Sequence, residues 1–257
     1  TYLPIVVAGQ ISAESHPEAI KAQTILARTY ICRQMEQMGL EEEIPESSLG
    51  LEKNRNNQME PLWGTEIFPE YYSRFEKAAR ETEGVTLTWE GHFIDPLFTH
   101  TTTGFTRPGD EEHPYLASVS CVHDPEEEGF VQEMIMQPEE AAKRVSAIPA
   151  GDGSFRTIPP EAFPEQVQII SRDEAGYALQ LQIGGFPFNG EEVRLALGLP
   201  SACFELNRHG SDVRFTVRGR GHGWGLSQTE AQALAEDGWS AEAILEYFYT
   251  GISFSSE

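Results

Sequence analysis

Cysteine and basic residues are scarce in this 257-residue chain, and long apolar runs are missing. The three cysteines form no C-x-x-C pair, which excludes a disulfide-stapled scaffold and leaves room for one bridge at most. Lys and Arg number 18 against 41 Asp and Glu, so the formal net charge is −23. Because neutralising phosphates needs clustered basic residues, we expect no nucleic-acid partner. No segment reaches the roughly 20 apolar residues that span a bilayer, so we expect membrane attachment only through a segment outside this sequence.

The cysteines Cys32, Cys121 and Cys203 fit no recognised metal-binding pattern. Cys121 and His123, with His100 nearby in the sequence, offer side-chain types that zinc accepts, but their spacing matches no known structural zinc motif. We therefore expect buried cysteine, surface histidine, no metal and no other cofactor. A zinc site is the alternative that the sequence leaves open.

The composition is that of a globular protein. Hydrophobic residues make up 39% of the chain and aromatic residues 10%, and 257 residues can bury a substantial core. Residues 149–164 are rich in Pro and Gly. We expect a single domain over 1–257, with a subregion boundary near 149–164.

Hydrophobic periodicity, caps and turn residues predict the secondary structure. The expected helices cover residues 17–38, 69–83, 138–147, 227–235 and 240–249. The expected hairpins cover 85–94 and 167–183, and further strands cover 97–103 and 213–217. Residues 6–8 indicate either a strand or the start of a helix, and the polar, acidic residues 40–66 indicate a long loop. Helices at both ends of the chain, with antiparallel hairpins between them, make the fold class α+β.

Residues 219–228 carry the densest motif, with the sequence G-R-G-H-G-W-G-L-S-Q. Four glycines at alternating positions remove the Cβ from one side, so another group can approach that backbone closely. The side chains of His222, Trp224, Ser227 and Gln228 are suited to stacking on a sugar or to hydrogen-bonding its hydroxyl and N-acetyl groups. The alternative is a tight glycine turn that packs the following helix.

Three segments resemble the SpoIID/LytB family (stage II sporulation protein D), and they occur in the family's order. Residues 2–30 read Y-L-P-I-V-V-A-G-Q-I-S-A-E-S-H-P-E-A-I-K-A-Q-T-I-L-A-R-T-Y, similar without gaps to the family's Y-L-x-G-V-V-A-x-E-M-P-A-S-x-x-x-E-A-L-K-A-Q-A-V-A-A-R-T-Y. Residues 98–106 (F-T-H-T-T-T-G-F-T) and 114–119 (P-Y-L-A-S-V) resemble F-x-S-T-S-G-G-x-T and P-Y-L-x-S-V. The glycine motif resembles G-R-G-Y-G-H-G-V-G-M-S-Q, with Trp224 where Val is usual and Arg220 where an aromatic residue is usual.

The resemblance implies a lytic transglycosylase of peptidoglycan, in which the 6-hydroxyl of N-acetylmuramic acid attacks its own anomeric carbon and leaves a 1,6-anhydro end. Ordinary glycosidases need two carboxylates, but a nucleophile already present in the substrate has the entropic advantage of position. One protein carboxyl can then suffice if partial burial raises its pKa towards neutrality. The resemblance also implies an extracytoplasmic location, in the cell wall or anchored to the membrane. Peptidoglycan glycan strands and other cell-wall hydrolases are the partners it implies.

The family's acid is the Glu of V-V-A-x-E-M, and Gln10 stands at that position here. An amide is nearly isosteric with a carboxyl but cannot cycle a proton. Three explanations stay open: an engineered inactivating change, a natural enzyme that uses another acid, or a non-catalytic module that binds or scaffolds peptidoglycan. We favour the catalytic lineage.

Glu14 is the most economical other acid, because residues i and i+4 share a face of a helix. In an extended segment the two positions would lie about 13 Å apart, and Glu14 would then be a poor replacement for an acid at position 10. Its alternative role is a carboxylate near the start of the following helix, where the helix dipole favours negative charge.

The resemblance gives roles to further residues by motif position. Lys21 and Arg28, seven residues apart on one helix, are candidates for holding the lactyl carboxylate of muramic acid, with ion pairs to surface acids as the alternative. Tyr30 is a candidate for contact with sugar or for the core. The remaining candidates for contact with the glycan or support of the acid lie in the later motifs: His100, Thr102, His222, Ser227 and Gln228.

Overall fold

The structure is a computed structural model that describes residues 2–40, 45 and 64–256. Most of the loop expected over 40–66 therefore lies outside the described residues. The chain divides into two compact units, which are described separately. Unit 1 comprises Thr1–Phe98, Pro108–Ala117 and Glu230–Glu257, and unit 2 comprises Thr99–Arg107 and Ser118–Thr229. Residues 149–164, where we expect a subregion boundary, lie inside unit 2.

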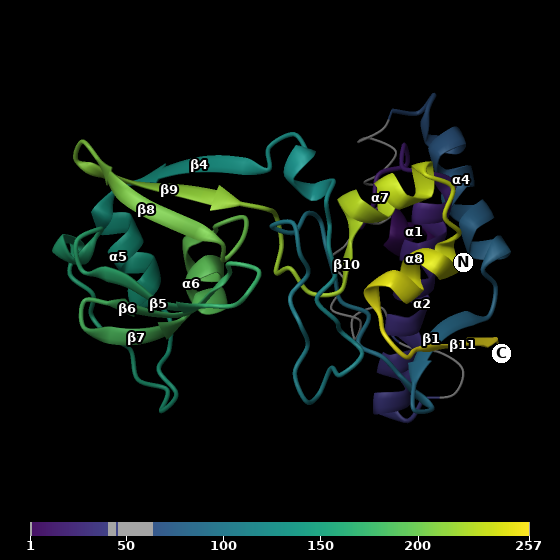
Figure 1. The fold of residues 1–257 in the computed structure, drawn as a ribbon, viewed down its shortest axis with the longest axis horizontal. Helices are drawn as coiled ribbons and strands as arrows, with labels where there is room; N and C mark the ends of the chain where they lie inside the picture. Colours follow the sequence, from purple (N-terminus) through teal and green to yellow (C-terminus); the bar gives the residue numbers. More distant parts are fainter. Residues whose placement is uncertain (1, 41–44, 46–63, 257) are drawn as a thin grey trace. The chain divides into compact units, whose positions relative to one another are not determined.

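Helices and antiparallel strands alternate along the chain, which confirms the α+β class (Figure 1). The α-helices are α1 (Leu3–Ala8), α2 (Pro17–Met38), α4 (Phe68–Glu81), α5 (Pro138–Ser146), α6 (Gly190–Leu197), α7 (Gln228–Glu236) and α8 (Ala241–Phe248). Among the described residues, the 3-10 helices are η2 (Asp124–Glu126) and η3 (Pro160–Ala162). The strands are β1 (Val85–Trp89), β2 (His92–Phe93), β3 (Phe98–Thr99), β4 (Val131–Met136), β5 (Val167–Arg172), β6 (Ala178–Ile183), β7 (Phe186–Asn189), β8 (Phe204–His209), β9 (Asp212–Arg218), β10 (Leu226–Ser227) and β11 (Ser253–Ser256).

Helix α2 has the predicted bounds because its two ends carry local signals. The ring Nδ1 of His16 accepts a hydrogen bond from the backbone N–H of Glu18, and Pro17 occupies the first turn. Gly39 ends the helix in the left-handed conformation, with φ at +66°. Residues 6–8 belong to a helix, α1, rather than to a strand.

Unit 1 packs helices against one another and against a small sheet. Buried side chains of α1, α2, α4 and the turn between α1 and α2 form one core, made of Val6, Val7, Ala13, Ile20, Ala27, Phe75 and Ala78. The sheet has the order β11-β1-β2, with both pairs antiparallel, so the last strand pairs with the predicted β1–β2 hairpin. A hydrogen bond from the Leu87 N–H to the Thr29 Oγ1, 3.0 Å long, links β1 to α2.

Unit 2 surrounds a second core with two antiparallel sheets, β4-β9-β8 and β5-β6-β7. Side chains of both sheets and of α5 and α6 contribute to this core, among them Ala141, Val145, Leu181, Ile183, Phe188, Val193, Leu197, Phe204 and Phe215. The predicted hairpin over 167–183 is confirmed as β5–β6. Figure 1 shows α5 and α6 grouped with the two sheets around this core.

Candidate functional site

The ten candidate residues divide equally between the two units. Unit 1 holds Gln10, Glu14, Lys21, Arg28 and Tyr30, and unit 2 holds His100, Thr102, His222, Ser227 and Gln228. Each set is built by its own unit.

Gln10 lies in the turn between α1 and α2 and is half-buried. Its Oε1 accepts a hydrogen bond of 2.9 Å from the Nε2 of Gln23, whose side chain is fully buried on α2. Gln23 is the glutamine of the K-A-Q segment that resembles the family. Two parts of the N-terminal motif, separate in sequence, therefore meet at position 10.

Glu14 lies in the same turn region but contacts another element. The turn is neither a helix nor an extended strand, so neither expectation for the spacing of residues 10 and 14 applies. Glu14 is exposed, and its Oε1 accepts a hydrogen bond of 2.7 Å from the hydroxyl of Tyr71 on α4. This hydrogen bond raises the pKa of Tyr71. Gln10 and Glu14 are thus held by different helices.

Lys21 is engaged by two carboxylates of unit 1. Its Nζ lies 2.8 Å from Glu18 and 2.8 Å from Glu81. Hydrogen bonds with Glu18 and Glu81, in that order of size, raise the pKa of Lys21. The side chain lines a cavity of about 130 Å³ together with Arg74, Lys77 and Glu81.

Arg28 is committed to backbone and hydroxyl oxygens of unit 1. Its Nη1 donates to the carbonyl of Val85 at 2.9 Å, and its Nη2 donates to the carbonyl of Ala79 and the hydroxyl of Thr82, each at 3.1 Å. Burial lowers the pKa of Arg28. Tyr30, two residues further along α2, is half-buried.

The glycines of the 219–228 motif accommodate neighbouring protein atoms. All four have positive φ, at +72° for Gly219, +113° for Gly221, +85° for Gly223 and +70° for Gly225. A Cβ on Gly221 would overlap the hydroxyl of Thr99, and a Cβ on Gly223 would overlap the ring of Tyr177. The close approach expected at these glycines is therefore made at two of them by side chains of unit 2 itself.

Arg107 is the residue of unit 2 that sequence reasoning missed most completely. It is 3% exposed, and its guanidinium carbon lies 3.7 Å from the ring centre of Trp224 and 4.8 Å from that of Tyr177. Its nitrogens lie 2.6 Å from Asp173 and 3.1 Å from Glu191. One face of the motif tryptophan is thus covered by a buried cation. No local pattern could have revealed this, because these partners are distant in sequence.

Thr102 and Ser227 meet at a buried carboxylate that sequence reasoning also missed. Asp124 is fully buried, and its Oδ2 accepts a hydrogen bond of 2.5 Å from the Thr102 N–H. The Ser227 hydroxyl lies 2.8 Å from both carboxylate oxygens. Both candidate side chains are fully buried. The Thr102 backbone N–H and the Ser227 hydroxyl, through Asp124, hold the loop and β10 together.

His222 and Gln228 flank this arrangement in the sequence. The Nδ1 of His222 accepts a hydrogen bond of 3.0 Å from the N–H of Trp224, and the two rings have centres 5.6 Å apart. Gln228 is the half-buried first residue of α7.

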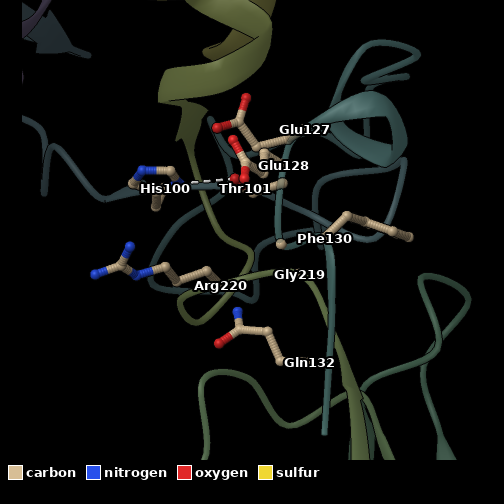
Figure 2. Close-up of a pocket in the computed structure, with 9 residues that line it drawn as sticks. His100, Thr101, Glu127, Glu128, Phe130, Gln132, Gly219 and Arg220 are labelled. Atoms are coloured by element: carbon tan, nitrogen blue, oxygen red, sulfur yellow. Dashed lines mark hydrogen bonds between the residues drawn. The ribbon is translucent and has the colours of Figure 1, made fainter.

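His100 opens onto a cavity of about 170 Å³ in unit 2, shown in Figure 2. Its Nδ1 lies 2.7 Å from the hydroxyl of Thr101, which lies 2.9 Å from that of Thr229. Desolvation by the surrounding atoms, and then repulsion from Arg220, lower the pKa of His100.

The described residues contain no metal centre of the kind considered for Cys121 and His123. Within residues 2–40, 45 and 64–256, no three His, Cys, Asp or Glu side chains gather where they could hold a metal ion. All three cysteines are described and none is in a disulfide; Cys121 and Cys203 are buried. In the same ranges, no helix combines the length and the apolar character needed to cross a bilayer.

Comparison with known proteins shows which family and which relatives this chain resembles. The SpoIID family (stage II sporulation protein) matches residues 1–89. Stage II sporulation protein D of Bacillus amyloliquefaciens is 28% identical over 263 residues, which cover 99% of this chain and 73% of that protein. The protein of the same name from Bacillus subtilis (strain 168) is 29% identical over 267 residues, with the same coverage of 99% and 73%.

A more distant relative covers less of its own length. The protein named amidase enhancer from Bacillus subtilis (strain 168) is 23% identical over 301 residues, which cover 98% of this chain and 40% of that protein. The family match includes the segment in which Gln10 and Gln23 meet, and the two sporulation proteins align with nearly the whole chain. This chain is similar to the SpoIID family over residues 1–89 and to two stage II sporulation proteins D over nearly its whole length.

Proposed function

We propose that this chain is a peptidoglycan-directed domain with the architecture of a lytic transglycosylase, in which Gln10 occupies the position of the acid. The similarity to the SpoIID family and to the relative named amidase enhancer supports a function related to the cell wall. The proposed substrate is the bond between N-acetylmuramic acid and N-acetylglucosamine. The proposed place of action is outside the cytoplasm, in the cell wall or at the membrane.

The observation that carries this proposal is the hydrogen bond from Gln23 to Gln10, 2.9 Å long. A carboxyl at position 10 would be half-buried, as Gln10 is, and partial burial raises the pKa of a carboxyl. It would accept the same N–H of Gln23, which would fix the orientation of the carboxyl. A half-buried oxygen held in one orientation supports a role for position 10 in proton transfer, provided that burial outweighs the hydrogen bond from Gln23, which favours the ionised form.

Glu14 does not share this environment. Its side chain is exposed and accepts a hydrogen bond from Tyr71 on α4, whereas Gln10 contacts α2. These contacts favour position 10 over position 14 as the place of the acid. We therefore expect the chain with Gln10 to bind glycan strands without cleaving them.

The test is digestion of purified, peptide-stripped glycan strands by the chain and by its Gln10→Glu variant, with products read by mass spectrometry. We expect 1,6-anhydro-muramic ends from the variant alone. Glu14→Gln, placed in both backgrounds, is the matched control, because it removes the other nearby carboxyl. We expect it to leave cleavage by the Gln10→Glu protein unchanged.

Two other results would change the assignment. Cleavage by the chain with Gln10 that Glu14→Gln abolishes would move the acid to Glu14. Binding of glycan by both proteins with no cleavage by either would contradict catalysis and favour a binding or scaffolding module. Absence of both binding and cleavage would contradict the proposed function as a whole.

A further inference from the structure

The cavity beside His100 brings opposite charges together without pairing them. It is lined by His100, Thr101, Glu127, Glu128, Gly129, Phe130, Gln132, Gly219 and Arg220, all of unit 2. In the view of Figure 2, His100, Glu127 and Glu128 lie above Arg220 and Gln132, and the Phe130 ring points away from them. The cavity is therefore lined mainly by polar and charged groups.

Backbone hydrogen bonds hold the three segments that form the walls. The Arg220 N–H donates to the Thr101 carbonyl at 2.8 Å, and the Thr101 N–H donates to the Arg220 carbonyl at 3.0 Å. The Gly219 N–H donates to the Phe130 carbonyl at 2.9 Å. A Cβ on Gly219 would lie 2.8 Å from the Thr102 carbonyl, so only glycine allows this approach. The backbone that carries the charged side chains is thus fixed.

The charged side chains of the cavity form no ion pairs with other described residues of the chain. Arg220, Glu127 and Glu128 are exposed, and in the part of the chain that the structure describes none of them forms an ion pair. The Gln132 amide makes no side-chain hydrogen bond within the same residues. Arg220 lowers the pKa of His100 while Glu127 raises it, so both charges act on one ring. A cavity lined by polar groups that the fold does not pair is a candidate ligand site.

We propose that this cavity binds the zwitterionic group of an amino acid, with the ammonium at Glu127 and Glu128 and the carboxylate at Arg220. This site is separate from the proposed cleavage chemistry and does not depend on the residue at position 10. It gives unit 2 an amino-acid ligand in addition to the proposed glycan.

The chemistry of the cavity matches such a group. An ammonium has three donors and no acceptor, and two adjacent carboxylates supply the acceptors that it needs. A guanidinium presents paired donors that fit a carboxylate in bidentate fashion. A neutral sugar would leave these charges without partners.

The experiment uses three probes: alanine, which carries both charges, N-acetylalanine, which lacks the ammonium, and alaninamide, which lacks the carboxylate. Binding is measured by titration of the whole chain, followed by the NMR signals of the His100 ring. Arg220→Gln removes the cation, and the double variant Glu127→Gln with Glu128→Gln removes the anions. The matched controls are Arg218→Gln and Glu126→Gln, exposed neighbours that do not line the cavity.

We expect alanine to bind and each cavity variant to weaken it about tenfold, the effect of losing one charge-assisted hydrogen bond. We expect Arg220→Gln to leave the affinity for alaninamide unchanged, because alaninamide has no carboxylate. We expect the double variant to leave the affinity for N-acetylalanine unchanged, because N-acetylalanine has no ammonium. Both control variants should bind like the original chain. The probe comparison needs no substitution, so it stands even if a variant were unstable.

Three results would overturn the proposal. One is no shift of the His100 signals with alanine at millimolar concentrations. Another is equal affinity for all three probes, which would show that the cavity does not recognise the charges of the ligand. The third is Arg220-dependent binding of peptide-stripped glycan strands without any binding of alanine, which would assign the cavity to sugar. None of these results bears on whether Gln10→Glu cleaves glycan, so the two proposals fail independently.

Discussion

Arg28 shows how a single motif residue is committed to the fold. Its guanidinium joins α2 to the end of α4 through Ala79 and Thr82, and to the start of β1 through Val85. A carboxylate ligand would have to replace three acceptors that the fold already supplies. The structure thus gives Arg28 a structural use at a position where the family resemblance suggested an anion contact.

The Arg28→Lys variant tests this use. A lysine ammonium cannot reach the same acceptors with a planar fork, so we expect the free energy of unfolding to fall by about 1–3 kcal/mol. Urea denaturation measures it, and Arg80→Lys on α4 is the control, because the exposed Arg80 should tolerate the change. Unchanged stability with reduced glycan binding would assign Arg28 to the ligand instead.

Gly223 is a second residue whose identity follows from its surroundings. Its φ is +85°, and the ring of Tyr177 occupies the space where a side chain would begin. Gly210 has a similar φ of +64°, but no neighbouring atom lies within 4 Å of the point where its Cβ would stand. Comparing substitutions at Gly223 and Gly210 therefore separates the free-energy cost of a side chain in a left-handed backbone conformation from the cost of a steric clash.

We expect Gly223→Ala to destabilise the protein by about 2–5 kcal/mol, the sum of left-handed strain and overpacking. Gly210→Ala should cost about 1–2 kcal/mol, because it carries the strain alone. Urea unfolding followed by tryptophan fluorescence measures both. Equal losses at the two positions would show that the ring of Tyr177 moves aside.

At the scale of elements, Asp124 of η2 links the 99–107 loop to β10. Its carboxylate accepts hydrogen bonds from the Thr102 N–H and the Ser227 hydroxyl. Because a buried carboxylate needs such donors, three segments that are distant in sequence are held together by one side chain. The S-Q end of the glycine motif therefore takes part in building unit 2.

Ser227→Ala should lower the free energy of unfolding by about 1.5–3 kcal/mol, since it removes a hydrogen bond to a buried charge. Ser211→Ala, at an exposed serine of the same unit, is the control and should have little effect. Differential scanning calorimetry measures both. If Ser227→Ala left the melting temperature unchanged and abolished glycan binding, Ser227 would be a ligand contact rather than a structural group.

At the scale of the whole molecule, the net charge of −23 acts on every part of the chain. Ion pairs such as Lys21–Glu81 and Arg107–Asp173 use some of the 18 basic residues, but 41 acids far exceed them. The excess negative charges repel one another in the folded state, and salt screens that repulsion.

We therefore expect the melting temperature to rise when NaCl is raised so that the Debye length falls from about 30 Å to about 8 Å. KCl at equal ionic strength should give the same rise, which would exclude binding of a specific ion. A fall in the melting temperature would mean that salt weakens the stabilising ion pairs more than it weakens the repulsion between the excess negative charges.

Much of the secondary structure could be predicted because its signals are local. Pro17 and Gly39 bound α2, and the Ser240 hydroxyl accepts from the Ala243 N–H at the predicted start of α8. Helix α6 was missed although it carries such signals, since Asn189 caps its first turn and Gly198 ends it at φ +71°. The strands β4 and β8 were missed because they pair with β9, and pairing between distant segments leaves little local trace.

The sequence by itself determined the fold class, the motifs that resemble the family and the presence of glutamine at position 10, where that resemblance implies an acid, because these properties reside in local patterns. Only the tertiary structure decided what the motif residues contact. It placed Gln23 against Gln10, buried Ser227 on Asp124 and covered a face of Trp224 with Arg107. Such contacts depend on packing and on the burial of charge, and Ser227 and Asp124 stand 103 residues apart.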